Sequence, residues 1–193
     1  ILILSGYGHS TDSETLEAFR SAVSQAVGPL NGVEPEVVIL FVSGEHLGSL
    51  EDGLATAAEV AGTDNVVGCS GMGILSIAAE LEQRTGVVAL ALGGEEVEAV
   101  PFLVPAEGAA EHIETKLTPY VVDAGLLCVF STVSAGHPGE MIEQLSDALP
   151  FPIVGGAASG TVLDPTSYQW FGQEYMTDGV SGVLLKGEFE ILT

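Results

Sequence analysis

Two kinds of segment follow one another along the chain, and their order is repeated. Short apolar runs predict β-strands, and stretches whose apolar residues recur every three or four positions predict helices. The strands predicted in the first copy cover residues 1–4, 36–42 and 86–92, and those in the second cover 97–104, 125–130 and 180–185. The predicted helices cover 12–27, 49–61 and 108–122, and a fourth follows residue 137.

Each copy contains one more predicted strand, which lies before its last apolar run and ends in a glycine-rich segment. The sequence VGCSGMG occupies residues 67–73, and VGGAASG occupies 154–160, so that Gly68 and Gly155 are 87 residues apart. We therefore divide the chain into two pseudo-symmetric βαβαββ halves, 1–98 and 99–193, within a single domain. Strands that alternate with helices predict an α/β fold, with a mixed, largely parallel sheet flanked by helices.

Charge and cysteine content narrow the possible functions. The chain carries 27 acidic and 4 basic residues, a net charge of −23, which disfavours nucleic-acid and anionic-membrane partners. No apolar run approaches the roughly 20 residues of a membrane-spanning helix. Cys69 and Cys128 lie in apolar strands at a spacing that fits no zinc motif, so we expect a cytoplasmic protein without metal or cofactor.

Three segments carry a resemblance to a known family. The sequences LFV at 40–42, NVVGCS at 65–70 and PIVGGAA at 152–158 together resemble the N-terminal FIST domain, and the similarity covers nearly the whole chain. The resemblance implies a sensory domain for signal transduction that binds a small ligand, an amino acid being the usual suggestion. It also implies a possible partner in a FIST C-terminal domain or a signalling module, and a homo-oligomer remains possible.

The loops that follow the strands are the candidate ligand site. In open parallel sheets ligands bind outside the carboxyl ends of the strands, and backbone N–H groups there hold carboxylates without help from basic side chains. We therefore expect a cleft for an amino acid or related carboxylate, lined by the glycine, serine and histidine residues of these loops. The candidate residues are His46, Gly68, Cys69, Ser70, Gly71, His137, Gly155, Gly156 and Ser159.

The two histidines occupy equivalent places in the halves. His46 and His137 each precede a helix, and a pseudo-twofold axis would bring both to one shared chamber. The aromatic segment 164–179 would cover this chamber or pack permanently on the sheet. Alternatively, each histidine belongs to its own loop, and the duplicated glycines serve close packing alone.

Two other functions remain open from the sequence. Cys69 is a weak candidate for a catalytic nucleophile, with His46 or His137 as its base, because such a thiol needs a neighbouring base or a helix N-terminus. The chain could instead be a scaffold or assembly module without a ligand, which predicts a filled crevice at the strand ends.

Overall fold

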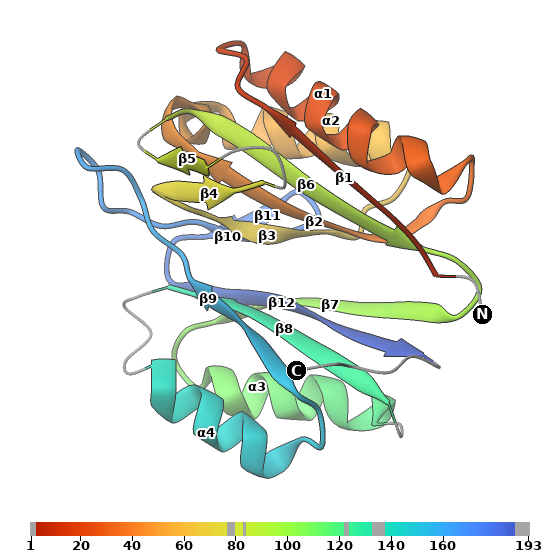
Figure 1. Cartoon of the computed structure of the whole chain (residues 1–193). Coiled ribbons are helices and arrows are strands. Elements are labelled where there is room, and N and C mark those ends of the chain that lie inside the picture. Colours follow the sequence, from red (N-terminus) through yellow and green to blue (C-terminus); the bar gives the residue numbers. More distant parts are fainter. Residues whose placement is uncertain (1–2, 77–79, 83, 122–123, 133–137, 188–193) are drawn as a thin grey trace.

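A computed structural model describes residues 3–76, 80–82, 84–121, 124–132 and 138–187, and these form four layers (Figure 1). Two sheets lie face to face in the middle. Helices α1 (Thr15–Val27) and α2 (Leu50–Ala61) cover the outer face of the first sheet, and α3 (Ala109–Leu117) and α4 (Pro138–Ala148) cover that of the second. The predicted α/β class is confirmed, with two sheets in place of one.

The strand order is the same in both halves. The first sheet contains, in spatial order, β1 (Leu4–Ser10), β6 (Gly86–Gly93), β2 (Pro35–Ser43), β3 (Val66–Ser70), β10 (Gln169–Phe171) and β11 (Glu174–Met176). The second contains β7 (Val97–Pro105), β12 (Gly179–Gly187), β8 (Gly125–Ser131) and β9 (Ile153–Ala157). A separate pair consists of β4 (Gly73–Leu75) and β5 (Glu80–Glu82). The order β1-β6-β2-β3 thus recurs as β7-β12-β8-β9.

Parallel pairing is less extensive than we predicted. Among the described strands, β2 with β3 and β8 with β9 are the parallel pairs, and every other pair is antiparallel. The reason is that the last strand of each half, β6 or β12, returns between the first two strands and runs opposite to both. The helical crossovers therefore account for one parallel pair in each half.

The space between the two sheets is filled by apolar side chains. Phe41 of β2 meets Phe130 of β8 edge to face, with ring centroids 5.2 Å apart. The buried residues around them are Val37, Ile39, Val67, Cys69, Val97, Cys128, Ala158, Val183 and Leu185. The continuous apolar runs of β2 and β8 therefore have both faces covered, one by helices and one by the opposite sheet.

Two predicted elements differ in extent from the observed ones. The first strand covers Leu4–Ser10 instead of 1–4, and its Gly6 and Gly8 lie directly against the backbone of α1. A glycine-containing strand on which a helix packs this closely lacks the apolar run used for prediction. Helix α3 ends at Leu117 and a 3-10 turn containing Pro119 follows, because proline disrupts an α-helix.

The aromatic segment of the second half crosses to the first sheet. Strand β10 pairs antiparallel with β3, placing Trp170 opposite Gly68, and β11 completes the edge. Trp170 is fully buried among the residues beneath α1 and α2. Within segment 164–179, Trp170 is thus part of the first half's core, which favours the permanently packed alternative.

Three 3-10 turns, Gly28–Leu30, Gly44–Ser49 and Thr118–Tyr120, complete the described elements. None of the helices in the described chain has the length and apolar character that crossing a membrane requires.

Candidate functional site

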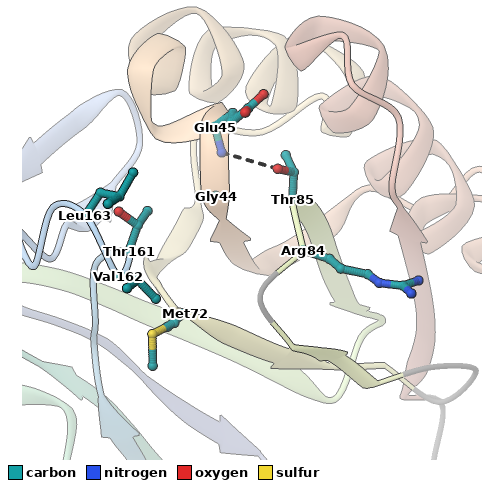
Figure 2. Close-up of a pocket in the computed structure, with 8 residues that line it drawn as sticks. All are labelled: Gly44, Glu45, Met72, Arg84, Thr85, Thr161, Val162 and Leu163. Atoms are coloured by element: carbon teal, nitrogen blue, oxygen red, sulfur yellow. Dashed lines mark hydrogen bonds between the residues drawn. The ribbon is translucent and has the colours of Figure 1, made fainter.

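A cavity of about 450 Å³ opens between loops of both halves (Figure 2). Five of its lining residues come from the first half and three from the loop after β9 in the second. They are Gly44, Glu45, Met72, Arg84, Thr85, Thr161, Val162 and Leu163. The cavity therefore lies at the carboxyl ends of β2, β3 and β9, the edge of the fold where a ligand was expected.

The local backbone fixes the first-half wall. Gly44 follows β2 with a φ of +68°, and a side chain there would collide with Thr85. The Glu45 N–H donates to Thr85 Oγ1 at 3.4 Å, and Ser43 Oγ donates to the Arg84 carbonyl at 2.7 Å. These contacts hold the end of β2 against the residues that lead into β6, so that Glu45 and Arg84 flank one wall.

The lining combines opposite charges with apolar side chains. Arg84 is one of only four basic residues in the sequence, and Glu45 supplies a carboxylate. Figure 2 shows both charged groups extending from the first-half wall, away from the 161–163 loop. Met72, Val162 and Leu163 are 45%, 73% and 96% exposed, so an apolar surface faces the opening. An apolar surface thus faces the opening, and the charged groups of Glu45 and Arg84 lie beside the cavity without pointing toward the 161–163 loop.

Ser70 and Ser159 join the two halves beside this cavity. Ser70 Oγ donates to the Ser159 carbonyl at 2.8 Å, and the Ser159 N–H donates to the Ser70 carbonyl at 3.0 Å. Ser70 Oγ also accepts from the Tyr168 N–H at 2.9 Å, and Ser159 Oγ accepts from the Met72 N–H at 2.8 Å. Both predicted residues therefore position the cavity wall, and neither lines it.

The paired glycines allow neighbouring strands to lie close together. A Cβ on Gly68 would lie 1.8 Å from the Leu40 carbonyl oxygen, and one on Gly155 would lie 1.8 Å from that of Val129. Each of these two predicted residues thus allows the same close strand contact in its own half. Of the other predicted glycines, Gly71 donates its N–H to the Val42 carbonyl at 2.9 Å, and Gly156 lies on the exposed strand β9.

Cys69 lies in the apolar layer between the sheets. It is 6% exposed, and burial raises the pKa of its thiol to about 12. Burial likewise raises the pKa of Cys128 to about 11. Because the thiolate is the nucleophile, Cys69 lacks the lowered pKa and the access that catalysis requires.

We expect both thiols of the native protein to react with Ellman's reagent at pH 8 about 100-fold or more slowly than after unfolding, where their pKa values return to the ordinary range. The measurement is the absorbance time course with and without denaturant. A native thiol that reacts within seconds would restore Cys69 as a candidate nucleophile.

His46 lies on the helix side of the first sheet and does not face the cavity. Its side chain is fully buried in the turn Gly44–Ser49, with Nδ1 3.1 Å from Thr15 Oγ1 and the ring edge to face with Phe19. Burial lowers the pKa of His46, although the Asp12 backbone contact and the charges of Asp12 and Glu45 oppose this. His137 lies outside the described residues.

The shared chamber we predicted is therefore not formed as expected. His46 points into one half's core, and side chains fill the space between the sheets. The cavity instead lies at the rim, where the loops diverge. We did not predict from the sequence that Arg84, Thr85 and the loop 161–163 line the cavity, although the scarcity of basic residues was a signal for Arg84. Within the described ranges, no group of three or more His, Cys, Asp or Glu residues is arranged to hold a metal ion.

Comparisons with known proteins identify the family. The family model described as the FIST N domain matches residues 36–193. No curated protein matches the sequence. Among solved structures, the crystal structure of a cyanuric acid hydrolase from A. caulinodans is 9% identical with a TM-score of 0.49, covering 97% of this chain and 72% of that one. With the family match spanning most of its length, the chain belongs to the FIST N domain family, a family of sensory-type domains that bind small ligands.

Proposed function

We propose that this chain is a single sensory domain of two halves, which binds an amino acid or related carboxylate in the cavity at the strand carboxyl ends. The observation that carries the proposal is the cavity of about 450 Å³, to which both halves contribute residues. A ligand that contacts Arg84 in one half and the 161–163 loop in the other stabilises the arrangement in which both contacts form. Signalling then follows from the population of that arrangement.

The charges around the cavity favour an amino acid over a simple carboxylate. Arg84 offers a donor fork for a carboxylate, and Glu45 offers an acceptor for an ammonium group. Both side chains are exposed and can rotate toward a ligand. The hydroxyl groups of Thr85 and Thr161 add further polar contacts. Arg84 is also a rare positive charge in a chain of net charge −23, so its place at this cavity suits an anionic group.

One observation supports the alternative that the chain is a scaffold or assembly module without a ligand. The middle of the interface between the sheets is filled with apolar side chains, as a module without a ligand would require. However, the crevice at the strand ends is open, and its lining includes charged and hydroxyl-bearing residues. The ligand-binding function therefore accounts for more of the site.

We expect amino acids that bind to raise the melting temperature in a thermal-shift screen, and Arg84→Ala to weaken their binding roughly 10-fold or more, because a charge-assisted hydrogen bond is lost. Isothermal titration calorimetry with the best amino acid measures the loss. The same amino acid without its carboxylate, as the corresponding amine, should bind wild type as weakly as the intact amino acid binds the variant.

Arg20→Ala provides the matched control. It removes the same charge from an exposed position on α1, away from the cavity. Equal losses in the two variants would indicate a general electrostatic effect and contradict the assigned site. A screen in which no amino acid or small carboxylate binds would contradict the proposed function itself.

A further inference from the structure

The outer edge of β9 differs from its counterpart in the first half. The edge of β3 is covered by β10, whereas β9 is the last strand of its sheet and has no neighbour on that side among the described strands. Four of its five residues are exposed, and Val154 is 47% exposed. Among the described residues, one of two equivalent edges is therefore covered and the other is open.

Backbone groups of β9 point out of this open edge. The Leu127 N–H donates to the Pro152 carbonyl at 3.0 Å, and the Ala158 N–H donates to the Ser131 carbonyl at 2.7 Å. Because bonding direction alternates along a strand, the even-numbered residues of this segment bond to β8. The N–H and C=O groups of Ile153, Gly155 and Ala157 are thus directed toward an additional strand.

A cavity of about 250 Å³ lies beside the same edge, between β9 and α4. It is lined by Met141 and Ile142 of α4, by Val129 and Ser131 of β8, and by the residues of β9. None of the lining residues carries a charge, although the whole chain has a net charge of −23.

The first half shows what fills the equivalent place. There Trp170 of β10 lies opposite Gly68 and is buried on the helix side of the sheet, among residues of α2. A cross-strand aromatic ring of this kind covers the surface that a glycine leaves bare. Gly155 is the counterpart of Gly68, with the same close approach to its neighbouring strand. The cavity beside β9 is thus the empty counterpart of the Trp170 site.

We propose that the β9 edge binds an extended peptide segment of a partner protein, antiparallel to β9, which inserts a large aromatic side chain into the cavity under α4. Addition of a strand supplies main-chain hydrogen bonds, and the cavity supplies selectivity for the side chain. The uncharged lining favours a segment that is itself uncharged at this position.

A second copy of the chain fits this edge less well. The five residues of β9 span only about 17 Å, and stable dimers usually bury about 1,200–2,000 Å². Pairing of two copies would also bring the exposed carboxylates of both α4 helices, Glu140, Glu143 and Asp147, toward one another. Charge therefore favours an uncharged partner segment over self-association.

The test uses a fluorescently labelled peptide that copies residues 166–173, TSYQWFGQ, because this segment occupies the equivalent edge in the chain itself. We expect saturable binding to the whole protein by fluorescence anisotropy, and at least about a 10-fold loss when the peptide's tryptophan is replaced by alanine. Hydrogen exchange should slow at the amides of Gly155 and Ala157 when the peptide is bound.

Two variants block the edge in different ways. Ala157→Pro removes one outward N–H on an edge strand, where proline is tolerated, and Ile142→Trp fills the cavity while the backbone stays intact. Each substitution should weaken binding of the peptide at least about 10-fold. Leu16→Ser, a substitution at an exposed position of α1, should leave peptide binding unchanged. Unfolding curves check that each variant is folded.

Three results would overturn the proposal. One is the absence of saturable binding to wild type, and another is equal binding by folded Ala157→Pro and Ile142→Trp proteins. The third is a dimer in size-exclusion chromatography that Ala157→Pro dissociates, since a second copy would then occupy the edge.

Discussion

Replacing Trp170 with alanine is expected to lower the free energy of unfolding by about 3–5 kcal/mol, the usual cost of truncating a large buried aromatic residue. Trp170 is fully buried, and it belongs to a strand contributed by the second half to the first sheet. Its loss therefore leaves a cavity under α2 and weakens a contact between the halves. Urea denaturation followed by far-UV circular dichroism measures the change, because Trp170 is the only tryptophan and its fluorescence is lost.

Trp170→Phe is the variant to compare with Trp170→Ala. The indole Nε1 of Trp170 is buried and has no hydrogen-bond partner among the described residues, so phenylalanine removes no hydrogen bond within this part of the chain. We expect it to cost less than half as much as Trp170→Ala. As a control, Leu163→Ala at an exposed position should change the free energy of unfolding by no more than about 0.5 kcal/mol. A loss below about 1 kcal/mol for Trp170→Ala would contradict its assigned role in the core.

Substitution of Gly155 by alanine is expected to cost about 2–3 kcal/mol, within the range for overpacking a close contact. The new Cβ would lie 1.8 Å from the Val129 carbonyl oxygen, so β9 must move away from β8. Gly155 also has a φ of +154°, which residues with a Cβ rarely adopt. Gly68→Ala should therefore cost somewhat less, although its Cβ meets the Leu40 carbonyl oxygen at the same distance. Equilibrium denaturation of both variants measures the two costs.

The neighbouring residue Gly156 is the matched control. No heavy atom lies within 4 Å of its Cβ position, and its φ is not positive. Gly156→Ala should therefore leave stability unchanged or raise it by up to about 0.5 kcal/mol, because alanine restricts the unfolded chain. If Gly155→Ala and Gly156→Ala have equal effects, the glycine motif is not explained by strand contact.

The internal repeat predicted more of the fold than any single motif. It indicated most of the strands and helices of both halves, because a duplicated pattern of apolar runs requires a duplicated arrangement of elements. The first strand nevertheless lies at Leu4–Ser10 instead of 1–4, and the pair β4 and β5 was not predicted. The repeat did not reveal two separate sheets, since a strand buried between a helix and a sheet has the same apolar sequence as one buried between two helices. Nor could it show that β10 joins the other half, because strand pairing at a distance of about 100 residues leaves no local signal.

The position of the cavity was predicted more accurately than the residues that line it. The carboxyl ends of β2, β3 and β9 do surround a cavity, as general α/β geometry leads one to expect. The residues that line it differ, because Ser70 and Ser159 hydrogen-bond to each other and His46 turns into the core. These orientations depend on tertiary contacts. Arg84 and the 161–163 loop come together only after the two halves have packed.

A crystal structure of the protein with the amino acid that binds most tightly would test the central claim most directly. We expect the ligand to occupy the cavity at the strand carboxyl ends, with its carboxylate on Arg84 and contacts to the 161–163 loop of the other half. A ligand bound within one half alone, or at a place away from these residues, would contradict it.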